Sequence, residues 1–454
     1  MALVPTAEPA LAGTHPQPFL AEPLLSAPLL PEPHMSEPHM MECRDCGLVQ
    51  LVPALPPGAR ATCPRCDAVL RTTRHNPLTL PLALNLTGLM LFGVGSTMSI
   101  MSLSSAGQHS GATLLSGPIG LERYGLIGLG AVVAVTTLAV PLVRVVGNIA
   151  VLLALRADRP PAWTKGVYAL AEHLRPWSMI EIYLLGVFVA YVKLISMAQI
   201  ELGAALFALG ALTVTMVAAD ALTDDHAVWE AIDRAPALPR HRARSAGIFA
   251  ARLHPIGCHT CGLVSLGRDG THCPRCGFTL HHRRTNAIAR AWALLIAAVI
   301  LYIPANIYPV LVIHQLGSTL PSTILGGVHE LMQAGMWPLA LLVFVASVVV
   351  PILKIVCMVF LLVTTQIGWP NALKERTVLY RIVEFVGRWS MIDVFMISIL
   401  VALVQFGAIT SIGPGRGATA FACVVILTMF AAECFDPRLM WDSAREPNQD
   451  AKPT

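Results

Sequence analysis

Long apolar segments divide this chain of 454 residues into two similar blocks. Each block has four segments long enough to cross a bilayer as a helix, which takes about 20 residues. They lie at about Leu78–Leu103, Leu126–Leu155, Met179–Met197 and Gly203–Ala221, and then at about Ala287–Ile313, Trp337–Thr365, Met391–Ile409 and Ala418–Phe435. Hydrophobic stretches of this length and number predict an all-α polytopic membrane protein.

Motifs of the first block recur in the second block in the same order. They are Pro141-Leu-Val-Arg144 with Pro351-Ile-Leu-Lys354, Trp177-Ser-Met-Ile-Glu181 with Trp389-Ser-Met-Ile-Asp393, and Ala219-Asp220 with Ala432-Glu433. Agreement over so many positions indicates an internal duplication. Because each block has an even number of spans, both blocks enter the membrane from the same side. The sequence therefore predicts two parallel repeats of four transmembrane helices.

Two Cys-x-x-Cys pairs precede each block. The first set is Cys43, Cys46, Cys63 and Cys66, and the second set is Cys258, Cys261, Cys273 and Cys276. Four thiolates in two tight turns are typical of a tetrahedral zinc site. Gly47, Gly262 and Gly277 follow second cysteines, where a left-handed backbone is needed, and Asp67 tolerates that conformation better than most residues. We expect a small zinc-ribbon module before each block.

Because all four ligands are protein thiolates, we interpret the two zinc sites as closed and structural. Iron also accepts tetrahedral sulfur, so a redox protein with rubredoxin-like sites is an alternative. Disulfides are disfavoured because the charge pattern places these cysteines on the cytosolic side. A visible iron–thiolate absorption band in the purified protein would separate the first two readings.

The charges give the orientation. Hydrophobic residues make up 55% of the chain and charged residues 13%, whereas about a quarter of an ordinary soluble protein is charged. The net charge of +4 is dispersed and gives no indication of nucleic-acid binding. Basic residues lie beside the apolar segments on one face, whereas the loops Ser104–Gly120 and Gly317–Gly327 are nearly uncharged. The positive-inside rule then places the zinc modules and both termini in the cytosol.

The order of these segments predicts seven regions. They are a disordered Pro-rich extension (1–40), zinc module 1 (41–76), transmembrane repeat 1 (77–222), a cytosolic linker (223–256), zinc module 2 (257–285), transmembrane repeat 2 (286–436) and a polar tail (437–454). Proline at the density of the first 40 residues prevents a continuous helix. Since the ordered pattern begins directly afterwards, a translation start at Met40 or Met41 is a further hypothesis.

Ionisable residues inside membrane segments are costly and usually face the bundle interior. Arg144 and Lys354 lie in the second span of each block, and Glu181 and Asp393 lie in the third. Similar depth and opposite sign predict an ion pair of Arg144 with Glu181 and another of Lys354 with Asp393. Either pair could fix helix register or serve proton coupling and gating. Lys193 could reach the far interface or contact a lipid phosphate.

Helix-breaking residues occupy matching places in the first span of each block, at Gly93–Ser99 and Pro304–Pro309. Breakers inside a span free backbone groups, which are tolerated beside a cavity or against protein, although a simple kink is an equal alternative. The segment 323–332 has helical apolar spacing and could lie at the interface or re-enter the membrane. The candidate residues for a substrate path are therefore Ser96, Thr97, Asn306 and Glu330.

From about Met41 to Asp442 the chain resembles the paraquat-inducible protein A family, which includes the lipophilic envelope-spanning tunnel A proteins. The resemblance rests on the doubled cysteine module, the layout of four plus four helices and Phe435-Asp-Pro-Arg438. It also rests on the motifs Pro-x-x-Lys/Arg and Trp-Ser-Met-Ile-Glu/Asp, which occur in both blocks. It implies a bacterial inner-membrane protein that passes phospholipid or another lipid to or from an MCE-domain tunnel protein in the periplasm. No nucleotide-binding loop Gly-x-x-x-x-Gly-Lys-Ser/Thr is present, and we expect no enzymatic activity. A non-transporting scaffold for the tunnel is the other alternative.

Overall fold

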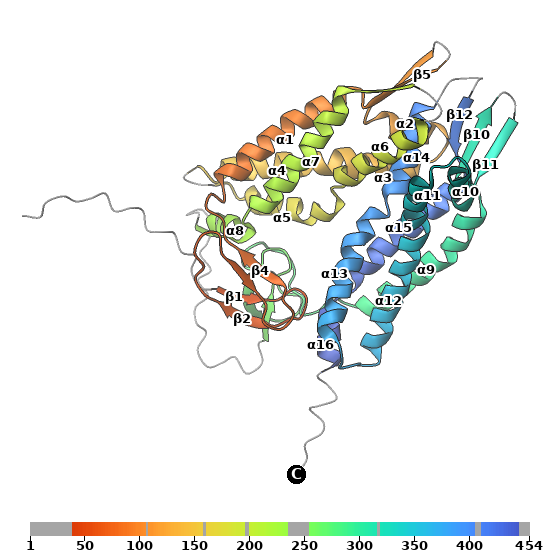
Figure 1. The fold of residues 1–454 in the computed structure, drawn as a ribbon. Helices are drawn as coiled ribbons and strands as arrows, with labels where there is room; N and C mark the ends of the chain where they lie inside the picture. Colours follow the sequence, from red (N-terminus) through yellow and green to blue (C-terminus); the bar gives the residue numbers. More distant parts are fainter. Residues whose placement is uncertain are drawn as a thin grey trace, which may run out of the picture.

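The computed structural model describes residues 39–105, 108–157, 160–195, 199–234, 254–315, 318–404 and 410–444. The Pro-rich extension and most of the predicted linker and tail lie outside these residues, so the hypothesis of a start at Met40 or Met41 stays a prediction. The fold is mostly helical, as predicted, with short strands that the hydropathy pattern did not show (Figure 1).

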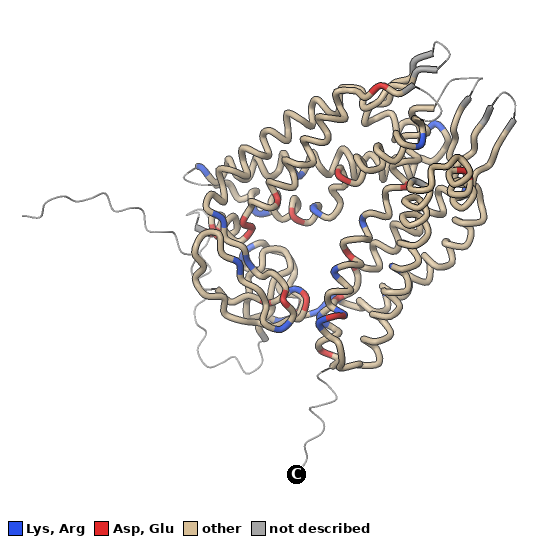
Figure 2. The backbone as a smooth tube through the Cα atoms, viewed as in Figure 1, with Lys and Arg blue, Asp and Glu red and all other residues tan. Residues whose placement is uncertain are grey.

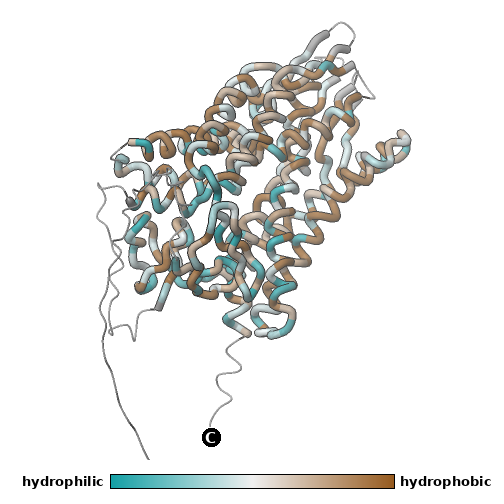
Figure 3. The backbone as a smooth tube through the Cα atoms, turned by 60° about the vertical axis from the view of Figure 1, so that its left-hand side comes forward, coloured by the Kyte–Doolittle hydropathy of each residue, from teal (hydrophilic) through white to brown (hydrophobic). Residues whose placement is uncertain are grey.

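Within the described ranges, eight helical segments are long and apolar enough to cross a membrane, so this is a multi-pass membrane protein. They are Thr79–Thr97, Ile127–Ala154, Arg175–Leu194, Ala204–Leu222, Ala287–Ile307, Ala340–Gln366, Leu373–Leu403 and Arg416–Cys434. Figure 3 shows hydrophobic residues over most of the helical part and hydrophilic ones gathered around the cysteine modules. We call the helix ends near those modules the module end.

In chain order, the first half is built from α1 (Thr79–Thr97), α2 (Ser116–Arg123), α3 (Ile127–Ala134), η1 (Val135–Ala139), α4 (Val140–Ala154), α5 (Trp163–His173), η2 (Arg175–Trp177), α6 (Ile180–Leu194), α7 (Ala204–Leu222) and α8 (Asp225–Arg234). The second half has α9 (Ala287–Ile307), α10 (Ile324–Gln333), α11 (Trp337–Phe344), η3 (Val345–Val349), α12 (Val350–Gln366), α13 (Leu373–Trp389), α14 (Ile392–Leu403), α15 (Arg416–Cys434) and α16 (Arg438–Ser443). The predicted amphipathic segment 323–332 is the helix α10, which Thr323 caps by accepting a hydrogen bond from the Gly326 amide.

A π-helical turn interrupts the second span of each half. The turns η1 and η3 each end two residues before a proline, Pro141 or Pro351. Proline has no amide hydrogen and its ring clashes with the carbonyl four residues earlier, so the preceding turn widens. The widened turn of η3 brings Ser347 to a buried position against the neighbouring helices.

The predicted breaks in the first spans are helix ends. α1 ends at Thr97 and α9 ends at Ile307. After each of these helices the chain enters a three-stranded antiparallel sheet. The strand orders are β6-β5-β7, from β5 (Met101–Ser105), β6 (Gln108–Ala112) and β7 (Gln199–Leu202), and β11-β10-β12, from β10 (Leu311–Gln315), β11 (Ser318–Ser322) and β12 (Thr410–Pro414). The expectation that helix continues to Leu103 and Ile313 was wrong, because strand pairing takes over the backbone hydrogen bonds there. We call this the sheet end.

The two halves meet along α14 and α6. Eleven of the twelve residues of α14 are buried, so this helix is enclosed by protein on all sides. Tyr183 and Phe395 pack edge to face with ring centroids 5.7 Å apart. A Cβ at Gly186 would lie 2.9 Å from the Phe395 Cβ, so glycine permits this close approach. A second contact joins Trp177 and Phe430, whose ring centroids lie 5.1 Å apart.

Each cysteine set lies in a small β-structured module. Module 1 has the hairpins β1 (His39–Glu42) with β2 (Val49–Val52) and β3 (Arg60–Thr62) with β4 (Val69–Thr72). Module 2 has the hairpin β8 (His254–Gly257) with β9 (Val264–Gly267) and an isolated bridge between His272 and Thr279. Lys, Arg, Asp and Glu gather around these modules and the module end of the helices (Figure 2).

Candidate functional site

The predicted cysteine sets come together as two compact clusters. In each cluster the four Sγ atoms lie within 4.8 Å of one another. Sγ–Sγ distances are 3.5 Å for Cys43 and Cys66, 3.6 Å for Cys46 and Cys63, and 3.5 Å for both Cys258–Cys276 and Cys261–Cys273. These separations are too long for disulfides, whose S–S bond is about 2.05 Å. They suit four sulfurs around one ion at about 2.3 Å each.

The turns that hold the thiols have the expected conformation. Gly47, Asp67, Gly262 and Gly277 all have positive φ, between 58° and 79°. Each of their amides donates to the carbonyl of the first cysteine of its pair, at 2.9 Å. Seven of the eight cysteines are buried. The donor set therefore fits a metal that prefers sulfur in a closed tetrahedral site, and a bound ion would tie together the two turns of each module.

The modules pack crosswise against the helices. The buried core of module 1 is continuous with side chains of the second half, including Leu295 of α9, Met358 of α12 and Trp441 of α16. The core of module 2 is continuous with side chains of the first half, including Ile149 of α4 and Trp229 of α8. Each module therefore packs onto the half that it does not directly precede, which the sequence order did not predict.

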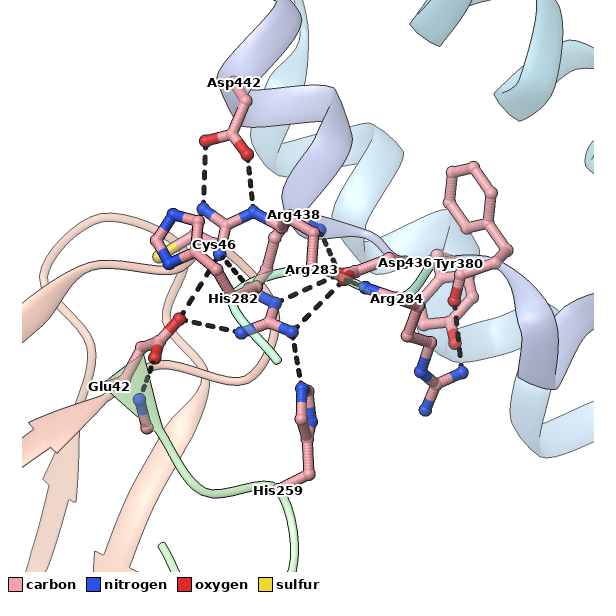
Figure 4. A network of polar contacts seen from close by, with 12 residues as sticks. Glu42, Cys46, His259, His282, Arg283, Arg284, Tyr380, Asp436, Arg438 and Asp442 are labelled. Carbon is pink, nitrogen blue, oxygen red and sulfur yellow. Dashed lines mark hydrogen bonds and ion pairs between the residues drawn. The ribbon is translucent and has the colours of Figure 1, made fainter. Parts of the chain in front are cut away.

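A network of buried charges joins both modules to the C-terminal helix (Figure 4). Arg438 Nη1 donates to Glu42 Oε1 at 2.7 Å, and the Gly257 amide donates to Glu42 Oε2 at 2.6 Å. Arg438 also donates to both oxygens of Asp436, at 3.1 Å and 3.2 Å. Arg438 Nη2 lies 2.7 Å from His259 Nε2. Burial, helped by the charge of Arg438, lowers the pKa of His259 to about 4, so His259 is neutral and accepts this bond.

A second arginine extends the same network. Arg283 donates to Asp442 from Nε at 2.6 Å and from Nη2 at 3.1 Å, the bidentate geometry typical of arginine and carboxylate. Its Nη1 lies 3.5 Å from Glu42 Oε1. Glu42 in module 1 thus links Gly257 and Arg283 of module 2 to Arg438 of α16.

A cavity of about 600 Å³ lies between the modules and the module end of the helices. We call it the module cavity. Its lining is rich in charge and includes Arg71, Asp224 and Glu172 from the first half and its module, and Arg381 from the second half. Burial raises the pKa of Glu172 to about 7, with a further rise from the charge of Asp225.

The Lys354 cavity, of about 290 Å³, shares Arg175 and Arg381 with the module cavity. It lies between the halves, where Arg175 and Pro176 face residues of α12, α13 and α15. Lys354 is 3% exposed, and its Nζ has no hydrogen-bond partner among the described residues. The lining also includes Glu384, Phe385, Gly387, Arg388 and Glu433.

An apolar groove of about 550 Å³ adjoins the Lys354 cavity, and Phe385 lines both. Its walls come from α6, α11, η3, the start of α12, α13 and α14, and nearly all of its lining residues are hydrophobic. Asp393 and Val343 line this groove and also a smaller cavity of about 50 Å³ that we call the Lys193 cavity. Adjacent cavities thus share lining residues all the way from the modules to strand β10 near the sheet end.

The Lys193 cavity brings two predicted residues together across the interface of the halves. Lys193 of α6 and Asp393 of α14 both line it, together with Ser347 of η3. Ser347 hydrogen-bonds the Asp393 carboxylate, whose Oδ2 has no partner among the described residues. The charges of Asp393 and of Glu330 act on Lys193. Ser347 was missed in the sequence, since a lone serine in an apolar run gives no signal until the π-turn is known.

The predicted ion pairs are not the ones in the structure. Arg144 Nη2 donates to Asp220 Oδ1 on α7 at 2.7 Å rather than to Glu181. Among the described residues, Lys354 and Asp393 form no ion pair, and they line different cavities. The predicted pairs were wrong because the position of a residue along the chain does not show which helix its side chain faces. Asp220 aligns with Glu433, and this correspondence was the overlooked signal.

The predicted substrate-path residues are less central than expected. Ser96 and Thr97 donate to the Gly93 carbonyl within α1, and Asn306 donates to the Tyr302 carbonyl within α9. They lie at the sheet end and line none of the four cavities described above. Glu330 is exposed on α10. Phe385 and Arg388, which do line the cavities, lie in a charged amphipathic helix that hydropathy alone does not mark as a span.

Comparison with known proteins identifies the family of the two helical halves. The family model described as Paraquat-inducible protein A matches residues 78–233 and again residues 288–445. The chain belongs to the paraquat-inducible protein A family. The two matched ranges cover both helical halves and leave the cysteine modules outside. The family assignment made from the sequence motifs is thereby confirmed.

Relatives in this family are named as transport proteins. The chain is 35% identical to the intermembrane transport protein PqiA of Escherichia coli K12, over 90% of this chain and 96% of the relative. It is 31% identical to the lipophilic envelope-spanning tunnel protein A of the same organism, over 89% of this chain and 92% of the relative. A probable intermembrane transport protein of Haemophilus influenzae is 27% identical, over 88% and 95%. No solved structure matches the chain.

Proposed function

We propose that this protein is the inner-membrane component of an intermembrane lipid-transport system. It would pass phospholipid or another lipid to or from a tunnel partner with MCE domains that spans the periplasm. The names of the relatives support transport between membranes through the envelope. The MCE partner and the bacterial inner membrane come from the family resemblance, and the charge pattern supports a cytosolic position for both modules and termini.

The series of cavities is the observation that carries this proposal. A lipid has a polar headgroup and apolar chains, so its site needs both kinds of lining close together. The apolar groove shares Phe385 with the charged Lys354 cavity. It shares Asp393 with the Lys193 cavity, a mostly apolar space that also contains Lys193 and Ser347. Its volume of about 550 Å³ falls in the range of about 300–1,000 Å³ that is usual for ligand sites.

The two halves and the modules have distinct parts in the proposal. We infer that the halves are parallel repeats from one duplication, because they share the order of helices, π-turns and sheets. We also propose that each cysteine cluster holds one structural zinc ion. Their crosswise packing then lets each zinc-ribbon module hold the module ends of both halves together, around the module cavity.

Three charged residues, Lys193, Lys354 and Asp393, are the candidates for coupling transport to an energy source. Lys193 and Asp393 lie in the interface of the halves, where movement of the halves would change their separation. Lys354 lines a cavity between the halves. Arg144, bonded to Asp220, has the structural role of fixing α4 against α7. Glu181 has no such partner among the described residues, and we assign it no coupling role.

Deletion of the gene in its native host tests the function. If the chain transports lipid, its loss changes the phospholipid composition of the outer membrane, and the wild-type chain restores it. A variant with Asp393→Asn should restore it only in part. If the loss leaves outer-membrane lipid unchanged and the purified chain retains no lipid, the scaffold alternative holds. If the purified chain contains iron instead of zinc, the redox alternative holds.

A further inference from the structure

Lys354 is the buried charge in this structure that most clearly lacks a partner. Its side chain is 3% exposed, and its Nζ has no hydrogen-bond partner in the described ranges. A buried ammonium without a partner is costly, because it has left water and gained no compensating contact. An ionisable residue in such a place inside a membrane protein usually marks a functional site.

The matching place in the first half shows what is missing. Arg144 is the counterpart of Lys354 in the shared Pro-x-x-Arg/Lys motif, and it bonds Asp220 at 2.7 Å. The counterpart of Asp220 is Glu433, which lines the same cavity as Lys354. No ion pair joins Lys354 and Glu433 in the described structure, although the charge of Glu433 acts on the lysine. The charge pair is therefore closed in the first half and open in the second.

The cavity of about 290 Å³ beside Lys354 leaves room for a ligand. On one side the ammonium packs tightly against Gly387, where an added Cβ would lie 2.7 Å from Nζ. Among the other cations of the cavity, Arg175 and Arg381 already contact carboxylates outside it, at Asp220 and Asp45. Arg388 lies with its guanidinium 5.8 Å from the Phe385 ring centroid. It forms no ion pair within the described ranges, although its charge acts on Glu384 in the same cavity. Lys354 and Arg388 are thus two cations that an entering anion can engage.

The neighbouring groove determines what kind of anion fits. Phe385 lines the Lys354 cavity on one side and the apolar groove on the other. The groove is walled by side chains such as Leu185, Leu342 and Val386, which exclude a polar ligand. An anion with a long apolar tail can place its charge beside Lys354 and its tail in the groove. A free phosphate ion would occupy the cavity alone.

We propose that the Lys354 cavity binds the phosphate of a membrane phospholipid whose acyl chains lie in the apolar groove. This inference rests on the proposed lipid-transport function and narrows its substrate to lipids that carry a phosphate. Lys354 and Arg388 donate charge-assisted hydrogen bonds to the phosphate oxygens. Phe385 separates the headgroup from the chains. A neutral lipid such as diacylglycerol lacks the group that Lys354 recognises.

The test compares lipid retention by purified full-length variants. Each is extracted in a mild detergent, and bound phospholipid is quantified by native mass spectrometry. Lys354→Gln should retain at least about tenfold less phospholipid than the wild type, the loss expected for one charge-assisted contact. Lys354→Arg keeps the charge and should retain most of it. The matched control Lys374→Gln changes an exposed lysine on α13, outside the cavity, and should have no effect.

Two further measurements distinguish the sources of the phosphate. Leu342→Trp narrows the groove and should also lower phospholipid retention, whereas excess inorganic phosphate should displace little of the lipid. If inorganic phosphate displaces it fully and Leu342→Trp has no effect, the cavity binds free phosphate and the inference is wrong. If diacylglycerol is retained as well as phospholipid by the wild type and by Lys354→Gln, the phosphate is not recognised, and the inference is equally wrong.

The same variants keep this inference separate from the proposed function. If Lys354→Gln retains phospholipid at the wild-type level while loss of the chain still changes outer-membrane lipid, the site is wrong and the function stands. If retention depends on Lys354 but loss of the chain leaves outer-membrane lipid unchanged, the site stands and the function is wrong. A variant that does not fold is recognised by the loss of its thermal unfolding transition. If Lys354→Gln does not fold, phospholipid retention by Lys354→Arg tests the site instead, and a folded Lys354→Arg that retains no phospholipid would contradict the inference.

Discussion

Arg438 Nη1 donates a hydrogen bond to Glu42 Oε1 at 2.7 Å, although the two residues lie 396 positions apart in the chain. Their side chains are 2% and 5% exposed. Glu42 Oε2 accepts from the Gly257 amide of module 2 at the same time. One carboxylate therefore joins the two cysteine modules to the C-terminal helix α16. The modules are parts of the helical assembly rather than independent domains attached to it.

Glu42→Gln should destabilise the folded protein more than an ordinary surface change. The substitution removes the charge that faces Arg438 and places an amide where both neighbours are donors. Breaking a buried ion pair costs about 3 kcal/mol or more. Thermal unfolding in detergent should show a clearly lower melting temperature. Glu375→Gln, at an exposed position of α13, is the matched control and should change it little. Equal melting temperatures for the two variants would contradict the role of Glu42.

Metal analysis of the purified protein should find two zinc ions per chain. Each cluster has four thiols at the separations that a tetrahedral ion needs. The double variant Cys43→Ser/Cys46→Ser should keep one ion, and so should Cys258→Ser/Cys261→Ser. Elemental analysis by mass spectrometry measures this directly. Iron in place of zinc, with visible colour, would overturn the structural role, and a single ion in the wild type would show that one cluster has another purpose.

Asp220→Asn should lower stability by about 1–3 kcal/mol, because it leaves the buried Arg144 guanidinium without its charged partner. Glu181→Gln should cost less than about 0.5 kcal/mol, as for an ordinary substitution away from such a contact. Melting temperatures of the two variants in the same detergent compare them directly. A larger loss of stability for Glu181→Gln than for Asp220→Asn would contradict this account and favour the ion pair of Arg144 with Glu181 that the sequence predicted.

Stability should fall as the pH rises from about 4.5 to about 7, and Glu172 should carry part of this fall. Burial raises the pKa of Glu172 from 4.5 to about 7, so the folded state holds a proton that the unfolded chain has already lost. The folded state therefore binds more protons in this window, and its stability decreases with pH. Below about pH 4.5 Glu172 adds no penalty, and above about pH 7 the penalty is complete.

Glu172→Gln removes this titration and should flatten the pH dependence. At pH 8 the variant should be more stable than the wild type by about 3 kcal/mol, and at pH 4.5 the two should nearly agree. Melting temperatures measured at both pH values give the comparison. A wild type and variant that lose stability in parallel between these values would show that Glu172 is ionised in the folded state.

Much of the helical framework could be predicted from sequence because a span is a local property of about 20 apolar residues. The cysteine clusters could be predicted for the same reason, since two residues between cysteines and a left-handed turn at Gly47 determine the local geometry. The ends of α1 and α9 could not, because strand pairing with β7 and β12 stops those helices. Hydropathy also missed α13, whose charged residues face the cavities and module 1.

The site itself depends on contacts between elements far apart in the chain. Asp393 could be predicted as a site residue because it is ionisable. Its neighbours could not, because Lys193 lies in the first half and Ser347 lies in the π-helical turn η3. The crosswise packing of the modules was equally hidden, since chain order suggests that each module rests on the half that follows it. Pairing charges by their predicted depth gave Glu181 as the partner of Arg144. In the structure α4 faces α7 at this point, and Arg144 bonds Asp220 instead.

Site-specific photo-crosslinking in the native membrane tests the central claim most directly, which is that lipid passes between the halves. A photoreactive residue is placed at Met396, which lines the Lys193 cavity and is 7% exposed. A second one is placed at Phe207 of α7, which is 69% exposed. Cells are labelled with radioactive phosphate before irradiation. The account predicts labelled phospholipid attached at both Met396 and Phe207. Labelling at Phe207 with none at Met396 would contradict it.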